Sequence, residues 1–331
     1  MDLIKTITED LAALDALLAK QEARVRRAFA TFLLQSTDPA VVKRVTDLVA
    51  QGNIEAALSV VDSHIVKMST VLPTIFQDAA AAEVAGLAPT MARLNPSVAV
   101  SFDPFDGPAA DMMRRNTLAF IAGFSEQQRT TTRDALIAQF ETGGGTQATA
   151  RAYRASIGLT PGQARAVDNY RRLLEEGSGQ ALDRALRDRR YDRTVERAVD
   201  TGQPLKQEQI DRMVARYRER MLAMRAETIA RTESVRTAAQ AREAAFLQMI
   251  QQTGIDPARV RQTWRSTMDN RVRDTHRAMN GQVRALGSAF DSPSGARLRY
   301  PGDPLAPASE TVNCRCAVTF TIAPIGVATA I

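Results

Sequence analysis

The first part of the chain has a helical repeat of apolar positions. Between residues 3 and 32 the apolar residues recur at steps of three, four or seven, which places them on one stripe of a long helix. Asp38 followed by Pro39 then has the pattern of an N-cap and a first helical position, so a second helix is expected to begin there. Further breaks between short helices are expected at Gly52, Pro73 and Gly86.

The middle of the chain continues this helical pattern. Ser125 and Thr160 each precede a Gln by three residues, which is the capping-box spacing and predicts a helix start at both places. The glycines at 143–145 and the Gly-Ser-Gly at 177–179 are expected to act as helix stops. Residues 205–253 contain neither Pro nor Gly and predict one extended helix.

The pattern changes after Gly254. Residues 260–267 have strand-like composition, residues 269–279 suit a short helix, and residues 311–322 alternate between apolar and polar as in a strand. The predicted fold is therefore mainly α, an elongated multi-helix body with a small C-terminal α+β module. Its expected regions are an N-terminal helical region (1–100), a helical body (101–253) and the module (254–331), with an irregular connector at 95–108.

The composition fits a folded protein outside the secretory and membrane classes. Of the 331 residues 44% are apolar, but no apolar run reaches the roughly 18 residues of a membrane span. The N-terminus lacks the order of regions of a signal peptide. Two Cys separated by one residue cannot form a disulfide framework, so synthesis in a reducing cytoplasm is expected.

Positive charge is concentrated in one region. Residues 151–300 contain 29 basic and 18 acidic groups, and all of the basic groups except Lys206 are Arg. Such a region can present a surface to nucleic acid or to an acidic partner. We expect the segments 184–197 and 212–225 to face that DNA or partner rather than to be buried. The alternative is a solvated helix face with internal ion pairs. The candidate interaction residues are Arg189, Arg190 and Arg193.

The C-terminal module contains one candidate metal site. Thiolate and imidazole are ligands that tetrahedral Zn²⁺ prefers, and Cys314, Cys316 and His276 offer them, with Asp274 or Asp269 as the fourth ligand. This requires the segment 313–316 to fold against the part bearing Trp264 and His276. The alternative is that the two Cys pack as small apolar residues beside a hydrogen-bonded His.

Enzymatic fingerprints are missing from the sequence. A nucleophilic arrangement of Cys314, His276 and Asp274 can be drawn, but there is no Gly-x-Ser-x-Gly, no His-Glu-x-x-His and no dinucleotide glycine pattern after a strand. The triple glycine lacks the Lys of a phosphate-binding loop. His64 lies in an amphipathic helical run and is interpreted as structural. We therefore expect no enzymatic activity.

The C-terminal part resembles the phage Mu F-like family of minor head, or head-morphogenesis, proteins. The likeness covers residues 205–320 well and 110–205 loosely, whereas residues 1–100 carry no family signal. It rests on an Arg-Thr-Glu helix, a Trp, an Asp-x-Arg-Val-Arg-x-x-His run and a terminal Asn-Cys-Arg-Cys. These motif residues are Arg231, Thr232, Glu233, Trp264, Asp269, Arg273, His276, Asn313, Cys314 and Cys316.

This resemblance implies a function in the phage particle. It implies a minor capsid component, present in few copies at the portal vertex, that acts in procapsid assembly, DNA packaging or DNA delivery after assembly in the host cytoplasm. The implied partners are the portal protein, capsid or scaffold proteins and packaged double-stranded DNA, with no membrane. The alternative is a DNA-binding structural protein inside the particle that does not depend on the portal.

Overall fold

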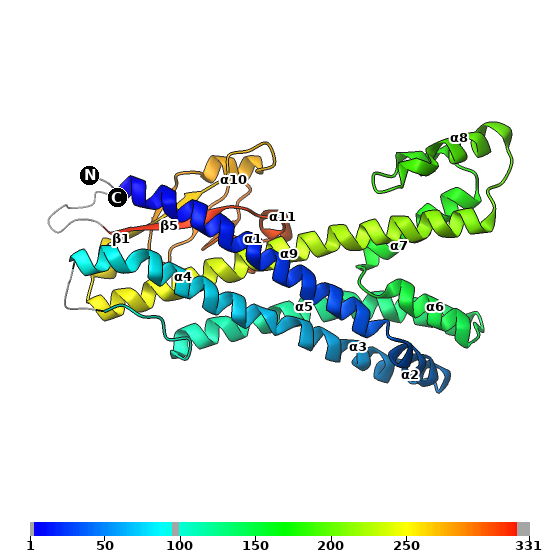
Figure 1. Ribbon diagram of the computed structural model, residues 1–331, viewed down its shortest axis with the longest axis horizontal. Coiled ribbons are helices and arrows are strands. Elements are labelled where there is room, and N and C mark those ends of the chain that lie inside the picture. Colours follow the sequence, from blue (N-terminus) through cyan, green and yellow to red (C-terminus); the bar gives the residue numbers. More distant parts are fainter. Residues whose placement is uncertain (1–2, 95–98, 323–331) are drawn as a thin grey trace. The chain divides into compact units, whose positions relative to one another are not determined.

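The computed structural model describes residues 3–94 and 99–322 and is built mainly from α-helices (Figure 1). Short antiparallel strands follow the longest helix near the C-terminus. This confirms the predicted class, mainly α with a small C-terminal α+β module. Within these two ranges, no helix is both long and apolar enough to cross a membrane.

The chain divides into two compact units that interleave along the sequence. Unit 1 comprises Met1–Ala28, Ser69–Ala119 and Thr228–Ile331, and unit 2 comprises Phe29–Met68 and Phe120–Glu227. The long helices α1, α5 and α9 therefore each contribute residues to both units. The three consecutive regions expected from the sequence stay a prediction.

Unit 2 is helical, and its helices begin where local capping residues predict. Asp38 accepts a hydrogen bond from the Ala40 backbone and starts α2, and Thr160 and Gln163 form a capping box at the start of α7. Its elements are the end of α1 (Leu3–Ser36), α2 (Pro39–Ala50), α3 (Ile54–Ser69), the second part of α5 (Gly107–Glu141), α6 (Thr146–Ser156), α7 (Pro161–Glu175), η1 (Gly179–Asp183), η2 (Arg189–Tyr191), α8 (Asp192–Thr201) and the first part of α9 (Gln207–Thr253).

Aromatic and polar side chains hold unit 2 together. Phe124 of α5 packs edge-on against Phe32 of α1, with ring centroids 5.4 Å apart. The buried Tyr153 hydroxyl donates to the Ser36 carbonyl at 2.8 Å, and the Ser36 hydroxyl lies 3.1 Å from Nδ1 of His64. Burial, with Lys67 nearby, lowers the pKa of His64. His64 is thus part of the packing, as its helical context indicated.

Unit 1 combines closely packed helices with the strands. Its helical elements are the start of α1, α4 (Val71–Leu94), the start of α5 and the end of α9. Their shared core is rich in small side chains, which lets the helices approach closely. It contains Phe76, Ala79, Ala80, Ala109, Ala238, Ala241, Ala244 and Ala245.

The C-terminal module of unit 1 is a three-stranded antiparallel sheet with short helices and a hairpin. The strand order is β2-β1-β5, and Trp264 of β1 lies opposite Val318 of β5. The module core packs Trp264, Met279, Phe290, Leu298 and both Cys. After η3 (Pro257–Arg259) the elements are β1 (Val260–Arg265), α10 (Asp274–Met279), β2 (Val283–Ala285), β3 (Phe290–Asp291), β4 (Arg297–Leu298), α11 (Ala308–Thr311) and β5 (Ala317–Ile322).

Two helix boundaries expected from the local sequence are wrong, a helix start at Ser125 and a break at Gly86. Helix α5 runs through Ser125, because the Gln128 side chain does not cap but binds the Ser156 carbonyl and the Gly158 backbone N–H elsewhere in unit 2. Helix α4 runs through Gly86. One glycine costs a helix only about 1 kcal/mol, which tertiary packing offsets.

The ends of two elements in the module also differ from expectation. The terminal strand begins at Ala317 rather than at Thr311, because residues 308–311 form α11 and Asn313 has a left-handed backbone with φ of 58°. Helix α10 begins at Asp274, since Asp269 instead accepts the Arg271 backbone N–H in a turn. Cys314 and Cys316 therefore lie just before the strand.

Candidate metal centre

Both thiols of the chain and one of its two imidazoles meet inside the C-terminal module. His276 lies on α10, and Cys314 and Cys316 lie between α11 and β5. The His276 Nδ1 atom is 3.5 Å from Sγ of Cys314 and 3.4 Å from Sγ of Cys316. All three side chains are buried, and their ligand atoms lie within 4.8 Å of one another. The structure thus places the predicted residues together, a set that can chelate a cation that prefers sulfur and nitrogen.

The surrounding elements fix the orientation of this group. The Ser266 hydroxyl at the end of β1 donates to the His276 carbonyl at 2.6 Å, and the Trp264 ring packs edge-on to the His276 ring. The Cys316 backbone N–H donates to Sγ of Cys314 at 3.4 Å, which folds the segment around the sulfurs. His276 is thereby held by Ser266 and Trp264, and the Cys segment by its own backbone hydrogen bond.

The other ring nitrogen of His276 faces a carboxylate that the sequence interpretation missed. Nε2 lies 2.8 Å from Oε2 of Glu310 on α11, at ion-pair distance but without hydrogen-bond alignment. Glu310 is only 3% exposed and accepts hydrogen bonds from the hydroxyls of Thr275 and Ser292. Its position four residues before Cys314 carried no motif signal.

Charges in the group influence one another. Burial raises the pKa of Glu310, but the Ser294 hydrogen bond, the charge of His276 and the other hydroxyls outweigh it and leave that pKa lowered. The hydrogen bond between the two Cys lowers the pKa of Cys316 and raises that of Cys314. The sulfur of Cys316 therefore carries the more thiolate character.

Neither carboxylate expected as the fourth ligand belongs to this group. Asp269 accepts hydrogen bonds from Arg315 at 2.5 and 2.7 Å, which lower its pKa together with the Arg271 backbone N–H. Asp274 has a side chain that is 99% exposed and lies near Arg277. Asp269 is bound to the guanidinium of Arg315 instead of to the His and Cys group. Because Asp274 is exposed and away from His276, the Cys314–His276–Asp274 triad is not formed.

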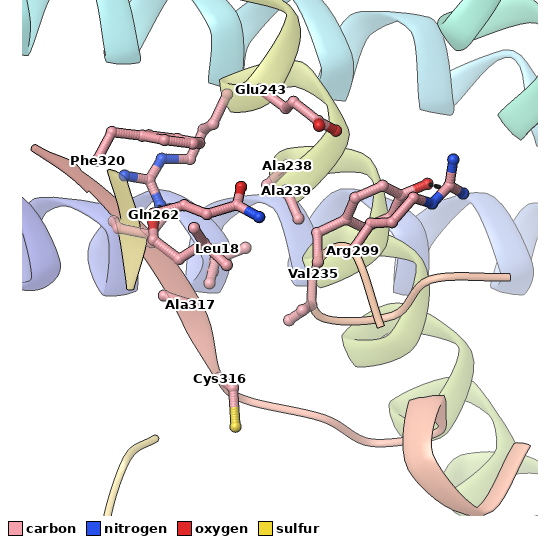
Figure 2. Close-up of a pocket in the computed structure, with 14 residues that line it drawn as sticks. Leu18, Val235, Ala238, Ala239, Glu243, Gln262, Arg299, Cys316, Ala317 and Phe320 are labelled. Carbon is pink, nitrogen blue, oxygen red and sulfur yellow. Dashed lines mark hydrogen bonds between the residues drawn. The ribbon is translucent and has the colours of Figure 1, made fainter. Parts of the chain in front are cut away.

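A cavity of about 20 Å³ lies beside the group, and Cys316 is among the residues that line it. It is bounded by α1, α9 and β5, with Leu18, Val235 and Phe320 among its lining (Figure 2). The sulfur of Cys316 points away from the other labelled side chains. This volume suits about one water molecule, so the cavity is no site for a larger ligand.

The candidate interaction arginines of unit 2 differ in their surroundings. Arg190 forms a hydrogen-bonded ion pair with the buried Asp188, which also lies 3.4 Å from Arg220. Arg189 and Arg193 are exposed and form no ion pair with any residue in the described ranges. The expectation that arginines at 212–225 face a partner is wrong for one residue: Arg225 is buried over the Phe124 ring.

Residues 191–319 match the family model described as Phage Mu protein F like protein. These residues form a phage Mu F-like segment. The match confirms the resemblance over α8, α9 and the C-terminal module. No curated protein and no solved structure matches the chain.

Within unit 1, the motif residues of the Mu F-like segment join α9 to the C-terminal module. The Asn313 backbone N–H donates to the Thr232 hydroxyl at 3.0 Å, directly before the Cys pair. Arg236 pairs with Glu233 and donates to the Gly302 carbonyl. Arg273 donates to the Val312 carbonyl. The motif therefore builds the scaffold that positions the His and Cys side chains.

Proposed function

We propose that this protein is a minor head component of a tailed phage that acts at the portal vertex in procapsid assembly, DNA packaging or DNA delivery. The carrying observation is the Mu F-like match over residues 191–319. The proposed location is the phage head, and the proposed partners are the portal protein and capsid or scaffold proteins.

The internal bonding of the motif supports an architectural role. Asn313 bonds to Thr232 of α9, Glu233 pairs with Arg236 on the same helix, and Trp264 fills the module core. Side chains that are used in this way stabilise a shape that a partner recognises. We accordingly propose no catalytic reaction for this segment.

Genetic depletion in the phage that encodes the protein tests this function. We expect the protein to co-purify with portal-containing procapsids, and we expect heads made without it to package less DNA or to infect poorly. Supplying the wild-type gene in trans is the control and should restore infectivity. Normal assembly, packaging and infection without the protein would contradict the proposal.

Exposed arginines offer a second test, aimed at the surface. We expect the variant Arg189→Glu/Arg193→Glu to weaken capture of the portal protein by about tenfold at low salt and to flatten its salt dependence, because both cations are free to contact an acidic partner. The control is Arg172→Glu/Arg216→Glu, which makes the same charge change at residues already paired with Glu176 and Glu219.

The same measurement separates portal binding from direct DNA binding. Equal weakening by both variants would show a net-charge effect rather than a local contact. A salt-dependent shift of free double-stranded DNA by the full chain without portal protein would favour the alternative, a DNA-binding structural protein inside the particle. Direct DNA binding is disfavoured because three arginines of this region already pair with neighbouring carboxylates, namely Arg187, Arg190 and Arg220.

A further inference from the structure

We propose that His276, Cys314 and Cys316 bind one zinc ion and that Glu310 holds the His276 ring in the orientation that this requires. The inference concerns a metal site rather than portal docking and stands independently of the proposed function. It rests on the positions of the ligand atoms and on the partner of the second ring nitrogen.

The spacing of the ligand atoms suits a tetrahedral ion. With bonds of about 2.3 Å to sulfur and 2.0–2.1 Å to nitrogen, a tetrahedral angle places a sulfur and a nitrogen about 3.6 Å apart. The observed separations of His276 Nδ1 from the two sulfurs are 3.5 and 3.4 Å. A zinc ion therefore fits with small adjustments of the side chains.

The convergence on one nitrogen distinguishes a metal site from packed thiols. In the neutral ring, Nδ1 has either one hydrogen or one lone pair, so it can satisfy only one of two neighbouring sulfurs at a time. Here both sulfurs approach the same nitrogen atom. A cation at their centre would bond to all three atoms at once, whereas apolar packing of the Cys side chains does not require this arrangement.

Glu310 provides the support that metal-bound His residues commonly have. Its carboxylate lies 2.8 Å from Nε2, on the ring nitrogen that does not face the sulfurs. A carboxylate there favours the proton on Nε2 and leaves the lone pair of Nδ1 directed toward the metal. Thr275 and Ser292 hydrogen-bond to the same carboxylate and hold it in place.

The protein supplies three of the four positions of a tetrahedral ion. Among the His, Cys, Asp and Glu side chains of residues 11–89 and 99–322, only these three form such a group. The binding free energy of the ion adds to the folding free energy, because the ligands come from separate parts of the module.

The test measures metal binding by the full-length protein purified under reducing conditions. We expect on the order of one zinc ion per chain by elemental analysis, and replacement by Co²⁺ should give sulfur-to-cobalt charge-transfer absorption. Cys316→Ser should abolish stoichiometric binding. Glu310→Gln should keep the stoichiometry at saturating zinc but raise the Kd about 10–100-fold.

Asp274→Asn is the matched control, since it removes one carboxylate from the same helix as His276 at an exposed position. Its zinc affinity should equal that of the wild type. If Glu310→Gln also binds zinc with wild-type affinity, the role assigned to Glu310 is wrong.

A measurement on the unmodified chain covers the case in which a Cys variant does not fold. Chelator extraction of the wild-type protein should lower its unfolding temperature and make both thiols reactive toward a thiol reagent, and added zinc should reverse both changes. Absence of stoichiometric zinc and cobalt binding, or unchanged stability and thiol reactivity after extraction, would overturn the metal site in favour of packed thiols.

Discussion

Replacing Arg242 with methionine is expected to lower the free energy of unfolding of unit 1 by about 3–5 kcal/mol. Arg242 lies on α9 and pairs with Glu83 of α4 at 2.5 Å, and the side chains are 9% and 10% exposed. It also donates to the Val318 carbonyl of β5 at 3.0 Å. The substitution leaves the carboxylate of Glu83 buried without its cation, which costs more than the pair itself contributes.

The fluorescence of Trp264 during urea unfolding measures this loss, because it is the single Trp of the chain and lies in the core of unit 1. Arg114→Met is the control, since Arg114 pairs with Asp111 at the surface of the same unit and should cost under about 1 kcal/mol. The double variant Arg242→Met/Glu83→Met should recover part of the loss. If Arg242→Met and the control Arg114→Met lowered the free energy of unfolding equally, the importance assigned to the buried pair would be contradicted.

Gly158→Ala is expected to destabilise unit 2 by about 2–4 kcal/mol. Gly158 follows α6 with φ of 83°, a conformation that disfavours a side chain. An added Cβ would lie 2.3 Å from a Leu33 methyl carbon and 2.7 Å from a Leu222 methyl carbon. The penalty therefore combines backbone strain with overpacking.

Gly177→Ala separates these two contributions. Gly177 also has positive φ, 64°, but an added Cβ there would meet no atom within 4 Å, so only the backbone strain of about 1–2 kcal/mol applies. Hydrogen exchange of peptides spanning residues 150–160 measures the local loss in the Gly158 variant. An effect of Gly158→Ala no larger than that of Gly177→Ala would show that the Leu side chains move aside freely.

Local bonding explains which helix starts could be predicted. Asp38 and Thr160 cap their helices through residues two or three positions along, so the sequence contains all that is needed. Ser125 carries the same local pattern, yet its partner Gln128 is used by groups 28 and 30 residues away. Competition from distant backbone groups cannot be read from a four-residue motif.

The candidate site shows the same distinction between chemistry and geometry. His276, Cys314 and Cys316 could be grouped because few residue types bind soft cations, and the structure brings these three together. The carboxylate that faces Nε2 of His276 could not be chosen from residue type alone. Which of many Asp and Glu residues faces Nε2 depends on the ring orientation and on where α11 lies, and these select Glu310.

The partners of two arginines limit how the Mu F-like segment can be joined to a different N-terminal sequence. Two arginines within residues 191–319, Arg231 and Arg242, meet carboxylates outside that segment, Glu22 and Glu83. A recombinant that joins the Mu F-like segment to a foreign N-terminal sequence must inherit an acidic side chain opposite Arg242 or replace that arginine. A chimaera joined upstream of residue 191 that does neither is expected to leave Arg242 buried without its carboxylate and to be less stable.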